Sequence, residues 1–155
     1  MPVAKLKEFL DGNKVQYATV THTPSITAQE TAQSAHIPGK NLAKTVIVKL
    51  DGKMAMAVLP ASYKVDLERL KQCAGAASAV LANEAEFRGQ FPQCELGAAP
   101  PFGNLYGLDV YVATPLAEDE EIAFNAGTHT ELIRLAYKDF ERLVRPKVCD
   151  FAARA

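Results

Sequence analysis

The first candidate for chemistry in this sequence is a lysine at the entrance to an apolar segment. Lys44 stands in the stretch Asn41-Leu-Ala-Lys-Thr-Val-Ile-Val48 and is followed by β-branched residues. A lysine at the start of an apolar strand can direct its ammonium into a cleft and bind a phosphate or an ester-linked oxygen. Alternatively, its aliphatic stem covers the edge of the core while the ammonium stays in water. The spacing alone favours this second interpretation.

The second candidate is the loop Gly97-Ala-Ala-Pro-Pro-Phe-Gly103. Glycine lets backbone amides approach a ligand closely, and proline restricts a loop to few conformations. Such a loop suits a wall that binds an oxyanion. Loops of this composition also serve as plain connections between elements.

The third candidate is the turn Asn125-Ala-Gly-Thr-His129, which lies between two predicted strands. Gly127 is expected to adopt a positive φ there, and His129 could act as a base, a hydrogen-bond donor or a contact to the end of an RNA. The alternative is a turn histidine that only faces water. His22 and His36 have similar alternatives, as residues at the end of a strand and of a helix.

Charge and composition narrow the classes of protein. The chain has 155 residues and a formal net charge of −1, which argues against broad, salt-driven binding along a nucleic acid, and we expect no DNA partner. Contact with a single RNA end stays open, although charge alone favours a small-molecule enzyme. No apolar run approaches the roughly 20 residues that cross a bilayer, and the N-terminus has no apolar signal-peptide core, so a cytoplasmic location without membrane contact is predicted.

Familiar catalytic and metal-binding motifs are absent from the sequence. There is no Walker A motif, no GxSxG elbow, no HExxH and no GxGxxG after a strand. Cys73, Cys94 and Cys149 form no CxxC pair and have no histidine at metal-ligand spacing. Reduced structural thiols are therefore predicted, rather than a disulfide or a zinc site.

Periodicity and turn residues predict the elements that must position these candidates. An Asp51-Gly52 turn indicates a tight hairpin, Thr27 and Glu30 form a capping box, and Asp66 and Asn83 are predicted N-caps. The predicted helices span 3–10, 27–36, 67–72, 84–91 and 137–144, and the predicted strands span 17–22, 45–50, 54–59, 108–112, 121–124 and 131–135. This order predicts one domain over residues 1–155 of the α+β class, with a mixed, largely antiparallel central sheet flanked by helices.

Taken in order, the motifs resemble those of one known family. They are His22-Thr-Pro-Ser25, Thr27-Ala-Gln-Glu30, Leu42-Ala-Lys-Thr-Val-Ile-Val48, Gly97-Ala-Ala-Pro-Pro-Phe-Gly103 and Asn125-Ala-Gly127, followed by a final helix. The set resembles the YbaK/ProX family of aminoacyl-tRNA deacylases, which is related to the editing domain inserted into many bacterial prolyl-tRNA synthetases. The resemblance covers essentially the whole chain.

The resemblance also implies the site and its chemistry. It implies the same mixed sheet with flanking helices, and hydrolysis of the ester between an amino acid and the 3′-terminal adenosine of tRNA, without a metal or cofactor. The residues implied as catalytic are Lys44, Gly97, Ala98 and Ala99. The residues implied as substrate-binding are His22, Thr45, Pro101, Phe102, Gly127 and His129.

Two positions depart from the family pattern. Ala98 stands where some relatives have a second glycine, and Ala113-Thr114 follows a strand where several relatives have an aspartate. Because both departures fall near the expected pocket, the resemblance does not carry the choice of amino acid.

The expected mechanism relies on positioning and charge stabilisation, because an aminoacyl ester is already activated. Lys44 would hold the terminal phosphate or the carbonyl region, and backbone amides around residues 97–99 would polarise the ester carbonyl. Water would attack with help from the ribose hydroxyl. The expected substrate is tRNA for proline that carries a small noncognate amino acid, and an aminoacyl-tRNA synthetase is an expected partner.

Two other classes of function are compatible with the residues. One is a non-catalytic module of the same fold that binds an aminoacyl end, an adenylate analogue or a protein. The other is a hydrolase of an unrelated small ester or amide, which would act without tRNA.

Overall fold

The structure of the chain is a computed structural model that describes residues 4–21, 41–87, 89–91, 94–95 and 98–154. Strands and short helices follow one another without a repeating βα unit. In chain order the described elements are α1 (Ala4–Gly12), β1 (Tyr17–Thr21), β2 (Leu42–Leu50), β3 (Lys53–Pro60), β4 (Tyr63–Val65), α3 (Leu67–Ala74), β5 (Ala79–Leu81), α4 (Glu84–Phe87), the 3₁₀ turn η1 (Gly103–Leu105), β6 (Asp109–Ala113), α5 (Thr114–Ala117), β7 (Glu121–Asn125), β8 (Glu131–Ala136), α6 (Tyr137–Val144), β9 (Lys147–Cys149) and β10 (Ala152–Arg154).

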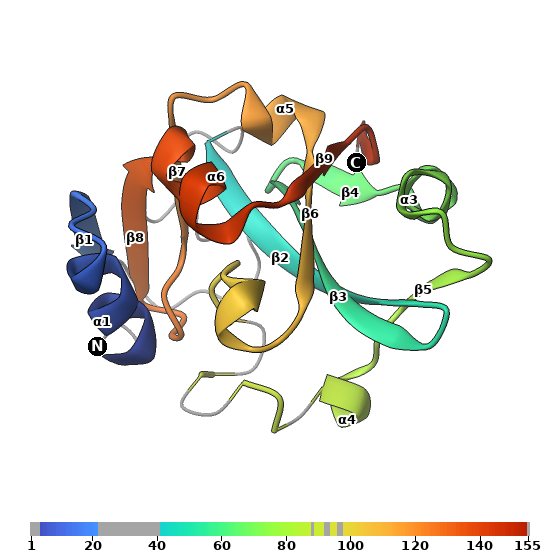
Figure 1. Ribbon diagram of the computed structural model, residues 1–155, viewed down its shortest axis with the longest axis horizontal. Helices are drawn as coiled ribbons and strands as arrows, with labels where there is room; N and C mark the ends of the chain where they lie inside the picture. The colour runs from blue at the N-terminus through green and yellow to red at the C-terminus, as the bar shows by residue number, and fades with distance from the viewer. Residues whose placement is uncertain (1–3, 22–40, 88, 92–93, 96–97, 155) are drawn as a thin grey trace.

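One mixed sheet organises the molecule (Figure 1). Within the described residues it has eight strands in the order β1-β8-β7-β2-β3-β6-β9, and β5 pairs with β2. The pairs β1–β8, β7–β8, β2–β3 and β2–β5 are antiparallel, and β2–β7, β3–β6 and β6–β9 are parallel. The predicted mixed, largely antiparallel sheet with flanking helices is confirmed.

The predicted hairpin at the centre of the sheet is confirmed. Asp51 has a φ of 52° and Gly52 a φ of 83°, the pair of positive values that a type I′ turn requires. This turn sets the register in which Lys49 faces Met54 and Lys44 faces Leu59.

The two faces of the sheet are covered by different elements, because side chains alternate along each strand. On one face, Ala43, Ile47 and Phe124 pack with residues of α1, α6 and the η1 region. We call it the aromatic face. On the other, Val48 and Leu59 pack with α3 and the C-terminal segment. Lys44 is an even number of residues before Val48 on β2, so its side chain is on the same face as that of Val48. We call this second face the lysine face.

The predicted helix caps at Asp66 and Asn83 are confirmed, whereas the capping box predicted at Thr27 and Glu30 lies outside the described residues. One predicted helix is shorter than expected. The side chain of Asp66 accepts hydrogen bonds from two amides at the start of α3. Asn83 and Glu86 accept reciprocal hydrogen bonds from each other's backbone amides, as in a capping box. However, α4 ends at Phe87 rather than near residue 91. Gly89 has a φ of 87°, which does not continue a helix.

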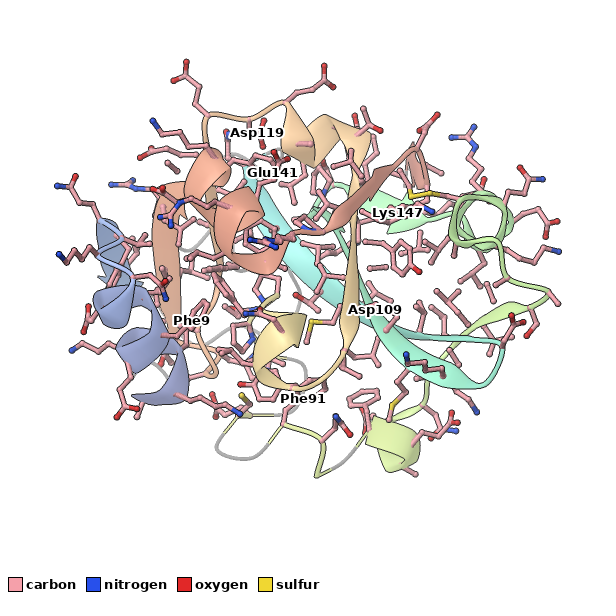
Figure 2. The ribbon with its side chains drawn as sticks, viewed as in Figure 1. Phe9, Phe91, Asp109, Asp119, Glu141 and Lys147 are labelled. Atoms are coloured by element: carbon pink, nitrogen blue, oxygen red, sulfur yellow. A yellow bond between two sulfur atoms is a disulfide. The ribbon has the colours of Figure 1, made fainter. Side chains whose placement is uncertain are left out.

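The prediction of reduced thiols is wrong for two of the three cysteines. Cys73 of α3 and Cys149 of β9 form a disulfide, with 6.1 Å between their Cα atoms. Figure 2 shows this bond in yellow beside α3, and Lys147 Nζ donates a hydrogen bond to the backbone carbonyl of Cys73 at 2.8 Å. The two residues are 76 positions apart, so only the tertiary fold brings them together. Cys94 is free.

Candidate functional site

The lysine predicted to carry the chemistry lies beside the carboxyl end of β7. β7 runs parallel to β2 with Leu42 opposite Ala123 and Ala43 opposite Phe124. Lys44 and Asn125 directly follow the last of these pairs on the two strands. Neighbouring strands lie about 4.8 Å apart, and side chains at matching positions of a parallel pair point to the same face. Lys44 and Asn125 are therefore neighbours on the lysine face.

Lys44 is half-buried, and burial lowers the pKa of its ammonium below the ordinary lysine value. Its cross-strand neighbour on β3 is the fully buried Leu59. Within the described residues, the Lys44 ammonium has no ion-pair partner. A cation that is partly desolvated and unpaired binds an anionic or carbonyl oxygen more strongly than a fully hydrated one does.

Asn125, the neighbour of Lys44, is not among the site residues expected from the sequence. Its Oδ1 atom is buried and has no hydrogen-bond partner in the described part of the chain. A buried amide oxygen without a partner is costly and occurs in few places in native proteins. In the sequence, Asn125 is only the first residue of the turn motif Asn125-Ala-Gly-Thr-His129, and no local pattern marks its amide. Its burial depends on the pairing of β7 with β2.

The turn after β7 holds the segment that contains Ala98. Gly127, with a φ of 100°, donates its amide hydrogen to the carbonyl of Ala98 at 2.9 Å. The carbonyl of Gly127 accepts from the amide of Glu95 at 2.7 Å. The carboxylate of Glu95 in turn accepts from the backbone amide of His129 at 2.6 Å. The structure thus gathers Ala98, Gly127 and His129 at the end of β7 that also carries Asn125.

Other predicted residues lie elsewhere. Thr45 follows Lys44 directly, so its side chain is on the aromatic face rather than beside the lysine. Phe102 is fully buried and makes edge-to-face contacts with Phe124 and Phe140, each with 5.4 Å between ring centroids. This position favours a packing role for the Phe102 ring over the predicted contact with substrate.

The remaining predicted residues are reported by position only. Pro101 is buried and Ala99 is half-buried in the chain that leads from Ala98 to Phe102. His22 and Gly97 lie outside the described residues, as does the predicted helix 27–36.

The site brings together a cation, an amide oxygen and backbone groups of a tight turn. In the described ranges, no three or more His, Cys, Asp or Glu side chains are placed to hold a metal ion. No helix in these ranges is both long and apolar enough to cross a membrane. The arrangement can bind and polarise an ester, in which developing negative charge meets fixed positive and dipolar groups.

Comparison with known proteins defines the class of protein. Residues 22–143 match the aminoacyl-tRNA editing domain, so the chain belongs to that family. The chain is also 34% identical over 115 residues to the multifunctional Ser/Thr-tRNA deacylase ProXp-y of Escherichia coli strain K12, a match that covers 70% of this chain and 68% of the relative. These findings confirm the resemblance and support the expected class of enzyme, a hydrolase that acts on aminoacyl-tRNA.

Solved structures share the fold at low sequence identity. The crystal structure of a hypothetical protein superimposes with a TM-score of 0.84 at 18% identity and covers 96% of this chain and 99% of the other. A protein described as a candidate trans-editing enzyme for prolyl tRNA synthetase superimposes with a TM-score of 0.79 at 19% identity, over 96% of this chain and 95% of that one. At this level of identity, the likeness supports the fold alone.

Proposed function

We propose that this chain is a trans-acting deacylase, which hydrolyses the ester of a tRNA that carries a small noncognate amino acid. The observation that carries the proposal is that the half-buried Lys44 and the unpartnered amide oxygen of Asn125 belong to neighbouring positions on one face of the sheet. The segment with Ala98 is hydrogen-bonded to the same end of β7. The chain belongs to a family of aminoacyl-tRNA editing domains, which supports an aminoacyl-tRNA ester as the substrate of this cluster.

In the proposed mechanism, each group acts on a different part of the substrate. The ammonium of Lys44 holds the terminal phosphate or the carbonyl region of the ester. The backbone amide of Ala99 polarises the carbonyl, since the amide of Ala98 already donates to the carbonyl of Glu95 at 3.0 Å. The oxygen of Asn125 accepts a hydrogen bond from the α-ammonium of the amino acid. Water attacks the carbonyl carbon while the ribose hydroxyl relays the proton. The bond between the carbonyl carbon and the esterified ribose oxygen then breaks. That oxygen takes up the proton and becomes a hydroxyl again, and the amino acid is released as the free acid.

The proposed substrate is tRNA for proline carrying alanine, cysteine, serine or threonine. The E. coli relative is described as a Ser/Thr-tRNA deacylase, so serine and threonine esters on their own tRNAs form the second substrate set. A pocket that hydrogen-bonds a side-chain hydroxyl can discriminate strongly against substrates without one, whereas a missing methylene changes affinity by only about 1–3 kcal/mol. A comparison of the rates for these amino acids therefore also indicates whether the pocket hydrogen-bonds a side-chain hydroxyl.

Further features of the proposal concern the whole protein. We expect one domain over residues 1–155, a cytoplasmic location and association with an aminoacyl-tRNA synthetase. The alternative is a module of the same fold that binds an aminoacyl end without hydrolysing it. That alternative predicts tight binding of charged tRNA and no loss of the ester.

The test is a deacylation assay with purified protein. Proline tRNA is charged separately with alanine, cysteine, serine, threonine and proline, and serine and threonine are also tested on their own tRNAs. We expect rapid loss of one or more small noncognate esters while prolyl-tRNA is spared. Activity on free aminoacyl esters with no preference for tRNA would instead assign the chain to the unrelated-ester hydrolases. No loss from any charged tRNA would contradict the proposal.

A further inference from the structure

A second feature at the end of the sheet is not used by the proposed chemistry. Where β1 begins and β8 ends, a cleft of about 560 Å³ opens between these strands, the start of β7 and the start of α6. Lys14, Arg134 and Lys138 line it together with Glu121 and Asp139. Lys14 is 120 positions before Arg134 in the sequence, so only the fold brings it to the two cations of the β8–α6 segment.

The charge in this cleft is unbalanced. Lys14, Arg134 and Lys138 are exposed, and within the described residues none of their side chains has an ion-pair partner. Asp139 is paired with Arg142 at 3.5 Å, so Glu121 is the one lining carboxylate that has no ion pair within the described residues. A cleft with several unpaired cations concentrates anions, even on a protein whose formal net charge is −1.

Arg134 places one side of the cleft on the same face of the sheet as the proposed site, whereas Lys138 belongs to α6, which covers the aromatic face. Arg134 lies opposite Ala18 on β1 and Ala123 on β7, and directly opposed side chains share a face. Ala123 packs with Leu42, two residues before Lys44, so Arg134 is on the lysine face. From strand spacing and rise, the Cα atoms of Arg134 and Lys44 are about 12 Å apart. α6 also begins at this cleft, and its N-cap residue Ala136 supplies no side-chain cap to the first amides.

We propose that Lys14, Arg134 and Lys138 form a binding site for backbone phosphates of the RNA strand that leads to the aminoacylated end. This inference rests on the proposed function, since it takes the end of that strand to lie at Lys44. A strand that is anchored at Lys44 and continues along the same face meets Arg134 within a few nucleotides, and it reaches Lys14 and Lys138 where it passes the end of the sheet. Three dispersed cations around an open cleft suit successive phosphates of a chain better than one small anion.

The experiment measures binding of uncharged tRNA as a function of salt. In the cleft variant, Lys14→Gln, Arg134→Gln and Lys138→Gln are combined. The matched control combines Lys53→Gln, Lys64→Gln and Lys71→Gln, which remove the same charge from the hairpin end, β4 and α3. In Figure 1 those elements lie on the opposite side of the molecule from β1 and β8.

We expect the cleft variant to bind tRNA about tenfold more weakly and the control to bind like the parent. The slope of log affinity against log salt should fall by about 2 in the cleft variant, as expected for the loss of three phosphate contacts. Equal losses in both variants, or no loss in the cleft variant, would overturn the inference. Displacement of the tRNA by inorganic phosphate at an equal phosphate concentration would also overturn it, because the cleft would then be a small-anion site.

A second readout separates this inference from the proposed function. Hydrolysis of an aminoacyl ester of adenosine alone does not engage the cleft, so the cleft variant should hydrolyse it at the parent rate while KM for charged tRNA rises. If the parent protein deacylates nothing, the proposed function fails. The salt-dependent binding of uncharged tRNA still tests whether the cleft binds phosphates. If the cleft variant loses activity on the adenosine ester as well, the cleft is not a separate phosphate site and the inference fails.

Discussion

The two faces of the central sheet are built from different kinds of residue. On the aromatic face, Phe102 is fully buried among the rings of Phe9, Phe124 and Phe140. Figure 2 shows Phe9 on the helix that covers this side. On the lysine face, the cluster next to the proposed site consists of small or medium aliphatic residues, namely Leu42, Ala61, Ala123 and Leu132 with Val20 at its margin.

This difference explains how one sheet can serve both stability and chemistry. Large interlocking rings fill space and exclude water, so they stabilise the fold but leave no room for a ligand. Small residues beside Lys44 and Asn125 keep polar groups at a partly buried surface, where electrostatic interactions are stronger than in water. Substitutions on the aromatic face should therefore change stability, whereas substitutions at the site should change hydrolysis.

The largest expected effect lies on the aromatic face. Phe102→Ala removes a buried ring from the centre of the aromatic cluster and should lower the free energy of unfolding by about 3–5 kcal/mol. Urea denaturation measures it, and Leu81→Ala, at a side chain that is 57% exposed, is the control with an expected change below about 0.5 kcal/mol. A small loss at Phe102 would mean that this face is not the packed half of the molecule.

The next effect is on catalysis at the lysine face. Lys44→Ala should reduce the rate of deacylation about 100- to 1,000-fold, the usual cost of removing one group that stabilises the transition state. Lys49→Ala is the matched control, because Lys49 is on the same strand but on the opposite face, where it pairs with Glu86. Single-turnover rates on the best charged tRNA compare the two. An unchanged rate in Lys44→Ala would rule out the proposed role of the lysine.

The third prediction concerns the contribution of the disulfide to stability on the part of the lysine face that α3 and the C-terminal segment cover. Here the Cys73–Cys149 disulfide ties α3 covalently to the C-terminal segment, in addition to the apolar packing around Phe151. Reduction with dithiothreitol should lower the free energy of unfolding by about 2–4 kcal/mol, as expected when a long closed loop is opened. Cys94→Ser, at the free cysteine, should leave this difference intact. Identical urea midpoints with and without reductant would contradict the expected contribution.

The orphaned amide gives a smaller effect that separates function from stability. Asn125→Leu keeps a similar volume but removes the acceptor, so deacylation should fall about tenfold. Stability should stay constant or rise, since the unpartnered buried oxygen is lost. Asn104→Leu, at an exposed position, is the control. A loss of stability in Asn125→Leu without a loss of activity would assign the amide to the fold rather than to the site.

Features encoded by neighbouring residues were predictable from the sequence. The hairpin follows from Asp51-Gly52, and the start of α3 follows from the side chain of Asp66, because each depends on residues within one turn. The positive φ expected at Gly127 is also observed, whereas the role of Lys44 stays a prediction.

Features made by distant strands were not predictable. The burial of Asn125 depends on parallel pairing with a strand about 80 positions earlier in the chain, which no local pattern reports. The Cys73–Cys149 disulfide and the short strands β9 and β10 depend on the same kind of long-range contact. Phe102 was predicted to contact substrate because it lies in a motif loop, whereas its ring turns inward to meet Phe124.

The smallest expected effect concerns the cost of keeping Lys44 charged on the lysine face. Burial lowers the pKa of its ammonium, so the charged form is less favourable in the folded chain than in the unfolded one. This penalty is fully present below the folded pKa. It is relieved as pH rises from the folded pKa toward 10.5, the ordinary value of lysine.

Lys44→Met, which keeps the stem but not the charge, should therefore be more stable than the parent at pH 7 by about 1 kcal/mol or less, and the difference should shrink as pH rises. Paired urea titrations at several pH values measure this difference. A variant that is less stable than the parent at pH 7 would show that the ammonium stabilises the fold, and the distinction between a stabilising aromatic face and a functional lysine face would then fail at its central residue.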